Sequence, residues 1–133
     1  MDLQESTAPT PRLLIIDDEP IVGKRLQQAF GKLGMEVAIF TSPLPAMEAM
    51  ALKPFDIVVT DLKMADMDGI EVLRRSRQLN SRARVIIITG YASQETADAA
   101  NKEGVFEFLA KPFRLEELKL AVNRALEELA GNA

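Results

Sequence analysis

Short apolar runs alternate with amphipathic segments along most of the chain. The runs are rich in β-branched residues, as in Leu13-Leu14-Ile15-Ile16 and Ile57-Val58-Val59, and they lack a polar alternation. This pattern is typical of strands buried on both faces of a parallel sheet. It predicts five strands, at residues 12–16, 35–40, 57–59, 85–88 and 105–110.

Between the strands, apolar residues recur at helical spacing. The first helix is expected to begin at Pro20, which suits a first turn, and to stop at Gly34. Further helices are expected at 43–50, after Ser42 as N-cap, at 69–79, at 93–103, and over an apolar stripe from 115 to 129. The helix at 93–103 should be the most weakly docked, because its inner residues are mostly small. These are Ala97, Ala99 and Ala100.

Five strands alternating with five helices predict a single α/β domain with a doubly wound parallel sheet. We expect this domain to span residues 12–129. Residues 1–11, which are polar and contain prolines, are expected to form a flexible N-terminal tail, and residues 130–133 a short C-terminal tail.

Polar residues follow the apolar runs at the points where the strands are expected to end. They are Asp17, Asp18, Asp61, Thr89 and Lys111. In an open parallel sheet, binding sites form beyond the carboxyl ends of the strands. We therefore expect these five side chains to meet at one rim of the sheet.

The residue types at this rim suit phosphoryl chemistry. Three carboxylates repel one another unless a cation joins them, and hard oxygen ligands favour Mg²⁺ or Mn²⁺. Lys111 and the Thr89 hydroxyl can bind phosphoryl oxygens, and loop amides near Lys63 are further donors. Asp61, on the central strand, is the best placed nucleophile. Taken singly, each residue is more simply a turn former, a helix-terminal acid or a surface lysine, but the joint coincidence at four strand ends favours a site.

Composition excludes several classes of function. There is no Cys and no His, which rules out disulfides, thiol catalysis, Ser-His triads and a phosphohistidine of its own. The net charge of −4 argues against direct binding of nucleic acid. No apolar run is long enough to span a membrane or to form a signal peptide, so a cytoplasmic protein is expected. A local group of arginines reads more simply as a solvated face than as a partner-binding patch. These are Arg74, Arg75, Arg77, Arg82 and Arg84.

Four motifs together resemble the receiver domain of two-component response regulators. They are Ile16-Asp-Asp-Glu19, Asp61-Leu-Lys-Met-Ala-Asp-Met-Asp-Gly69, Ile87-Ile-Thr-Gly90 and Leu109-Ala-Lys-Pro-Phe113, and they follow the order and spacing of that family. The resemblance covers about residues 12–129 and is closest to the nitrogen-regulation and FixJ-like receivers. It implies a flavodoxin-like sheet of order 2-1-3-4-5.

The resemblance also implies a role for each residue at the rim. Asp61 would accept a phosphoryl group from a histidine of a sensor kinase or phosphotransfer protein. The acidic pair Asp17 and Asp18, with Asp61 and the main-chain carbonyl of Lys63, would hold Mg²⁺. Thr89 and Lys111 would bind the phosphoryl oxygens, and the Lys111–Pro112 peptide would be cis.

Further implied features concern switching and rates. Thr89 would move toward the phosphoryl group, and Phe108 would rotate into the vacated space; the alternative is that Phe108 is only a core aromatic. This would change the face made by the helix at 93–103, the fifth strand and the last helix, through which the protein would contact an output domain, an output protein or a second copy. Lys63 and Tyr91 border the path of hydrolytic water and would set the lifetime of the phosphoryl group. In the loop after Asp61, Ala65 stands where the family often has proline.

Three other classes of function fit the sequence less well. A haloacid-dehalogenase-like phosphohydrolase needs a carboxylate two residues after the nucleophile, where this chain has Lys63. A flavin or nucleotide binder needs a phosphate loop after the first strand, where the chain has an acidic run instead. A docking module without phosphorylation is disfavoured because no member of the site is missing. We therefore expect a switch that catalyses only its own phosphorylation and dephosphorylation.

Overall fold

The computed structural model describes residues 9–131. Strands and helices alternate along the whole described chain. They are β1 (Arg12–Ile16), α1 (Pro20–Gly31), β2 (Glu36–Phe40), α2 (Pro43–Leu52), β3 (Ile57–Asp61), α3 (Gly69–Leu79), β4 (Arg84–Thr89), α4 (Gln94–Lys102), β5 (Glu107–Ala110) and α5 (Leu115–Gly131).

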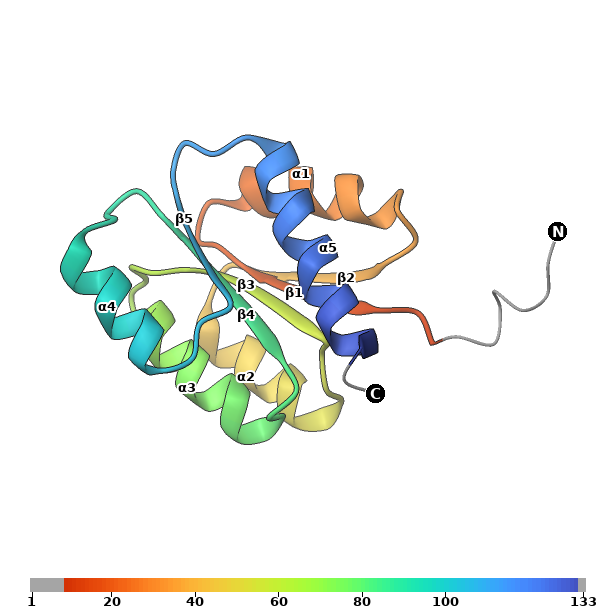
Figure 1. Cartoon of the computed structure of the whole chain (residues 1–133), viewed down its shortest axis with the longest axis horizontal. Helices are drawn as coiled ribbons and strands as arrows, with labels where there is room; N and C mark the ends of the chain where they lie inside the picture. Colours follow the sequence, from red (N-terminus) through yellow and green to blue (C-terminus); the bar gives the residue numbers. More distant parts are fainter. Residues whose placement is uncertain (1–8, 132–133) are drawn as a thin grey trace, which may run out of the picture.

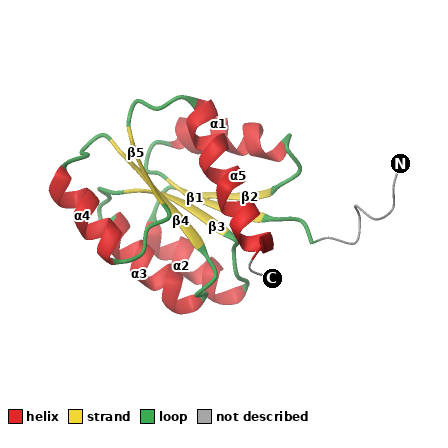
Figure 2. Cartoon of the chain, in the orientation of Figure 1, coloured by secondary structure: helices red, strands yellow, loops and turns green. Residues whose placement is uncertain are grey.

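All five strands lie in one parallel sheet, in the order β2-β1-β3-β4-β5. Helices α1 and α5 cover one face of the sheet, and α2, α3 and α4 cover the other (Figures 1 and 2). The predicted α/β class and strand order are confirmed. Among residues 9–131, no helix is long and apolar enough to cross a bilayer.

Two apolar clusters, one on each face of the sheet, form the core. The central strand β3 is buried along its whole length, and Leu13 to Ile16 of β1 have no exposed surface. Successive residues of a strand point to opposite faces, so continuous apolar runs feed both clusters at once. The first cluster includes Phe30 of α1 and Leu118 of α5, and the second includes Met50 of α2 and Leu73 of α3.

The observed elements differ from the predicted ones mainly at their ends. Helix α1 ends at Gly31, and Gly34 lies in the following turn with φ of +90°, a conformation that suits glycine. Ser42 is the N-cap of α2, but its side chain makes no capping hydrogen bond. Helix α5 runs to Gly131, so two of the residues expected in the C-terminal tail are helical.

The expected tails fall partly outside the described chain. Residues 1–8 and 132–133 are not described, and residues 9–11 precede β1 without regular structure. The last of these, Pro11, is joined to the sheet, because its carbonyl accepts a hydrogen bond of 2.9 Å from the Glu36 N–H.

Helix α4 is weakly docked, as predicted, although not through all three alanines. Ala100 is fully buried and Ala97 is half-buried, whereas Ala99 is exposed. The start of α4 is well defined by a capping box between Ser93 and Thr96. Helix α4 therefore has a fixed N-terminus but few apolar contacts with the rest of the core.

Candidate functional site

The predicted site residues meet at the carboxyl edge of the sheet. Asp61 ends β3 and Thr89 ends β4. Asp17 directly follows β1, and Lys111 directly follows β5. The register explains the alignment, since Asp61 pairs with Ile88 and β4 continues by one residue to Thr89. The Lys111 N–H donates to the Thr89 carbonyl at 2.8 Å, which fixes the Lys111 main chain beside β4.

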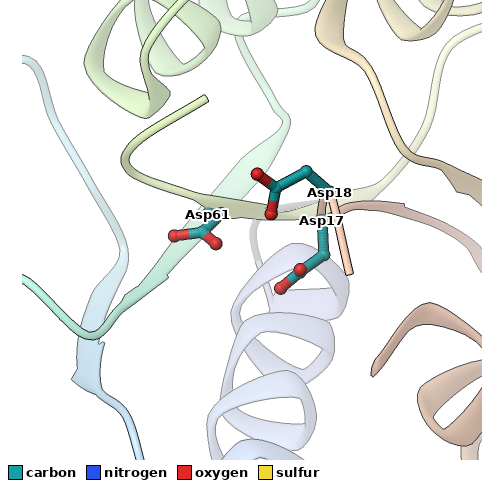
Figure 3. Close-up of side chains that lie close together, drawn as sticks. All are labelled: Asp17, Asp18 and Asp61. Carbon is teal, nitrogen blue, oxygen red and sulfur yellow. The ribbon is translucent and has the colours of Figure 1, made fainter. Parts of the chain in front are cut away.

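Three carboxylates form an acidic trio, Asp17, Asp18 and Asp61 (Figure 3). Each residue offers one oxygen, and these oxygens lie within 4.8 Å of one another. Asp17 and Asp61 are 1% and 7% exposed, whereas Asp18 lies at the surface. Two of the three charges are therefore largely removed from water, with one open side at Asp18.

Lys111 supplies the positive charge that these buried carboxylates require. Its Nζ lies 3.0 Å from Asp17 Oδ2, 3.1 Å from Asp61 Oδ2 and 3.2 Å from Glu19 Oε1. Burial lowers the pKa of Lys111, but its hydrogen bonds and ion pairs with Asp17 and Asp61 outweigh burial and raise the pKa above its ordinary value. Lys111 is therefore charged across the physiological range. The Lys111–Pro112 peptide is cis, as expected.

Burial dominates the ionisation of Asp17. It raises the pKa of this carboxyl above its ordinary value, and hydrogen bonds from the Glu19 N–H and from Lys111 offset only part of the effect. The Glu19 N–H lies 2.9 Å from Asp17 Oδ1. An additional cation beside Asp17 would thus relieve a charge that the fold buries at a cost.

The backbone around Asp61 is closely packed. The Leu62 N–H donates to Asp61 Oδ1 at 2.7 Å, and the Gly69 N–H donates to the Leu62 carbonyl at 2.7 Å. A Cβ on Gly69 would lie 2.4 Å from the Asp61 carbonyl oxygen. Sequence patterns mark Gly69 as a turn former, but its packing against Asp61 shows that this position leaves no room for a side chain.

Thr89 is buried beside the site but does not contact its charged groups. Its Oγ1 accepts a hydrogen bond of 2.9 Å from the Tyr91 N–H. Within residues 9–131, the Thr89 side chain makes no hydrogen bond to Asp61 or Lys111. Lys63 and Tyr91 are both exposed, and Lys63 Nζ lies 5.2 Å from the centroid of the Tyr91 ring. This contact joins the loop after β3 to the loop after β4.

Phe108 belongs to the apolar packing of the sheet. It is half-buried on β5, pairs with Ile87 of β4, and packs against the apolar cluster on the α2–α4 face. This position is compatible with a core aromatic and with a residue that rotates, and the expected role of Phe108 stays a prediction.

Glu19 is a member of the site that the sequence interpretation did not single out. It is exposed, it is the N-cap residue of α1, and its carboxylate contacts Lys111, which is 92 residues away in sequence. The available signal was its place in the acidic run, two residues after Asp17.

The local group of arginines makes contacts within the protein, which favours the simpler interpretation. Arg74 and Arg75 pair with Glu71, Arg74 also pairs with Glu103, and Arg84 pairs with Glu128. Arg77 donates to the Gly104 carbonyl and Arg82 to the Leu129 carbonyl.

The arrangement combines an all-oxygen set of ligands with a lysine. Such ligands bind hard divalent cations, and a lysine beside a carboxylate can bind an added anion.

Residues 13–123 match the family model for the response regulator receiver domain. The chain belongs to this family. Receiver domains are signalling switches of two-component systems, not conventional enzymes.

Curated relatives are similar over most of this chain. Regulatory protein AtoC of Escherichia coli (strain K12) is 40% identical over 116 residues, which cover 87% of this receiver domain but 25% of AtoC. The chain thus spans about a quarter of AtoC. Sporulation initiation phosphotransferase F of Bacillus subtilis (strain 168) is 31% identical over 115 residues, and the match covers 86% of this chain and 93% of that protein.

Solved receiver structures share the fold. A CheY-like receiver domain protein from Methanospirillum hungatei JF-1 has a TM-score of 0.90 at 26% identity, over 94% of this chain and all of that one. A Burkholderia pseudomallei response regulator with a phosphorylated aspartic acid, calcium ion and citrate has a TM-score of 0.79 at 28% identity, over 92% and 73%. The beryllofluoride-activated NtrC4 receiver domain dimer has a TM-score of 0.84 at 31% identity, over 89% and 98%.

Proposed function

We propose that this receiver domain accepts a phosphoryl group on Asp61 and acts as a phosphorylation-controlled switch. The observation that carries the proposal is the Lys111 ammonium, which lies 3.1 Å from Asp61 Oδ2 beside the acidic trio. At this position it can bind an oxygen of a phosphoryl group on Asp61. The related Burkholderia pseudomallei structure, with its phosphorylated aspartic acid, supports this chemistry.

The proposed step transfers a phosphoryl group from a phosphohistidine. An oxygen of the Asp61 carboxylate forms a bond to phosphorus as the P–N bond breaks. The electron pair of that bond stays with the imidazole nitrogen, which takes up a proton. Lys111 and the Thr89 hydroxyl stabilise the negative charge on the transferred oxygens. Hydrolysis of the resulting acyl phosphate resets the switch, so the domain acts only on itself.

The acidic trio fits a divalent cation, Mg²⁺ or Mn²⁺. Its donors are all carboxylate oxygens, they converge within 4.8 Å, and burial raises the pKa of Asp17. Asp17, Asp18 and Asp61 would hold the ion together with the main-chain carbonyl of Lys63. When bound, it would offset charge on the carboxylates and on the phosphoryl oxygens. The calcium ion in the Burkholderia pseudomallei structure is consistent with such a site.

We propose that Thr89 and Phe108 transmit the signal. A phosphoryl group on Asp61 would offer a charged acceptor to the O–H of the buried Thr89, whose oxygen now accepts a hydrogen bond from the Tyr91 N–H. Thr89 would then be displaced toward Asp61. The displacement would leave room for the half-buried Phe108 to turn inward. Helix α4 has one fully buried residue, Ala100, so it can shift with little loss of apolar burial. The α4–β5–α5 face would change as a result.

Lys63 and Tyr91 are proposed to set the lifetime of the phosphoryl group. Their contact across the two loops supports a shared effect on the access of water to Asp61. The Lys63→Ala, Tyr91→Ala and double variants should alter dephosphorylation, with the double variant departing from the product of the single effects. Unchanged rates in the double variant would contradict this role.

The partners follow from the proposed chemistry. The phosphodonor would be a sensor histidine kinase or a histidine phosphotransfer protein, in the cytoplasm. An apolar cavity of about 420 Å³ beside Lys111, lined by residues such as Leu26 and Phe113, would suit a side chain of this donor. The output would be a further domain, a separate protein, or a homodimer through α4–β5–α5, and the NtrC4 receiver dimer supports this last arrangement.

Intact mass after incubation with acetyl phosphate and Mg²⁺ tests the proposal. The wild type should gain one phosphoryl group that is stable in acid and labile in base, and the adduct should depend on Mg²⁺. Asp61→Asn should gain none, and Asp56→Asn provides a control, because Asp56 directly precedes β3 at the end opposite to Asp61. An equal adduct on Asp61→Asn would overturn the proposal.

A further inference from the structure

Lys111 has all of its hydrogen-bond donors engaged in the unphosphorylated protein. A lysine ammonium has three N–H donors. Here three carboxylates lie within 3.2 Å of Nζ, and they belong to Asp17, Asp61 and Glu19. A phosphoryl oxygen on Asp61 would therefore share the donors of Lys111 with the carboxylates of Asp17 and Glu19.

Glu19 is held in place by the same network. Its N–H donates to Asp17 Oδ1, Lys111 bonds to Asp17 Oδ2, and Lys111 also bonds to Glu19 Oε1, so the three residues form a closed ring. The side chain of Glu19 is 62% exposed, whereas that of Asp17 has no exposure. The Glu19 contact is thus the one made on the solvent side of the ammonium.

We infer that Glu19 is a positioning residue that restrains Lys111 and regulates how readily Asp61 is phosphorylated. By occupying one donor, Glu19 holds the ammonium toward α1 and limits its attraction to Asp61 and to an incoming phosphoryl group. The Glu19 charge also adds to the acidic trio, which favours a cation and repels an anionic phosphodonor. This inference rests on the proposed phosphorylation of Asp61.

Two opposite effects follow from removing the Glu19 charge. Glu19 Oε1 and Asp61 Oδ2 lie 3.2 and 3.1 Å from Lys111 Nζ, so these two oxygens are at most about 6 Å apart. One unit charge at that distance in a water-like dielectric changes a rate by about three-fold. A divalent cation has twice the charge, which corresponds to about ten-fold in affinity. Glu19→Gln should therefore bind Mg²⁺ about three- to ten-fold more weakly. At saturating Mg²⁺, it should react with acetyl phosphate about three-fold faster.

The experiment uses wild type, Glu19→Gln and the control Glu48→Gln, which removes an equal charge from the exposed surface of α2. Mg²⁺ affinity is measured by calorimetry on the unphosphorylated protein, and the adduct is measured by intact mass. Weaker Mg²⁺ binding together with faster phosphorylation in Glu19→Gln alone would support the inference. A helix-terminal role of Glu19 would change only the stability of α1 and neither of these two quantities.

The outcomes separate the two levels of the proposal. If the wild type forms its adduct and Glu19→Gln matches Glu48→Gln in both measurements, the role of Glu19 is overturned while the proposed function stands. If Glu19→Gln loses both Mg²⁺ affinity and phosphorylation rate, Glu19 assists Lys111 instead of restraining it, which also overturns the inference. If the wild type forms no adduct, both fail.

Discussion

Replacing Lys111 by methionine should destabilise the folded protein by about 2–3 kcal/mol, because two buried carboxylates lose their cation. Lys111 Nζ lies 3.0 Å from Asp17 and 3.1 Å from Asp61. At such distances, an effective dielectric constant of about 20 gives roughly 5 kcal/mol of attraction per pair before desolvation is counted. Removing one partner of a buried pair typically costs about 3–5 kcal/mol. We expect about 2–3 kcal/mol, at or below the lower end of this range, because the site is open to water beside Asp18.

The assay is urea unfolding followed by far-ultraviolet circular dichroism, since the chain has no tryptophan and a single tyrosine. Lys24→Met, on the exposed surface of α1, is the matched control and should change stability by less than about 0.5 kcal/mol. Mg²⁺ should stabilise Lys111→Met more than the wild type, because no ammonium then competes for Asp17 and Asp61.

The pH dependence has a definite sign. Burial already raises the pKa of Asp17, and loss of Lys111 removes one of the contacts that lower it. The loss of folding stability caused by burying the ionised Asp17 carboxylate is therefore complete at pH values above the pKa of Asp17 in the folded state. It disappears as pH falls below the ordinary carboxyl range, where Asp17 is protonated in both states. A Lys111→Met variant as stable as the wild type at pH 7, with no added response to Mg²⁺, would refute this reasoning.

Three further predictions concern a close backbone contact, a buried charge and a helix cap. Gly69→Ala should lower the free energy of unfolding by about 3 kcal/mol, because the added Cβ would lie 2.4 Å from the Asp61 carbonyl oxygen. Gly31→Ala, where a Cβ would meet open space, is the control and should be neutral or stabilising in urea unfolding. Equal effects of the two substitutions would contradict the close approach. Asp17→Asn should stabilise the protein at pH 7, because burial raises the pKa of Asp17 while Lys111 keeps Asp61 and Glu19 as partners. This gain should vanish as pH falls below the ordinary carboxyl range, and a gain independent of pH would contradict the prediction. Ser93→Ala should weaken the α4 capping box by about 1 kcal/mol. Hydrogen exchange should then accelerate in α4 but not in α3, and equal acceleration in both would contradict a local role.

The sheet and the meeting of the charged residues could be predicted because each signal is local. Buried parallel strands appear as continuous apolar runs, and the residue that ends each run is readable in the sequence. Asp61 and Lys111 are 50 residues apart, yet both follow such runs, and parallel strands bring their ends to one edge. Helix α3 has the predicted bounds, since Asp68 caps it and its apolar stripe is regular.

Other features depended on packing that no local pattern records. The contact between Glu19 and Lys111 joins an exposed carboxylate to a residue 92 positions away, and many surface carboxylates offer the same sequence signal. The three alanines of α4 could not be separated by type, although only Ala100 is fully buried. Gly34 marks the turn after α1 correctly, but the helix ends earlier because a positive φ is needed beyond its last turn.

The central claim is that Asp61 itself carries the phosphoryl group, and chemical localisation of the adduct tests it most directly. Borohydride reduces an aspartyl phosphate to homoserine, so peptide mass spectrometry after acetyl phosphate treatment can identify the modified position. We predict homoserine at position 61 in the wild type and at no position in Asp61→Asn. Homoserine at Asp17, Asp18 or another carboxylate, or its absence from a wild-type protein that has bound Mg²⁺, would contradict the account.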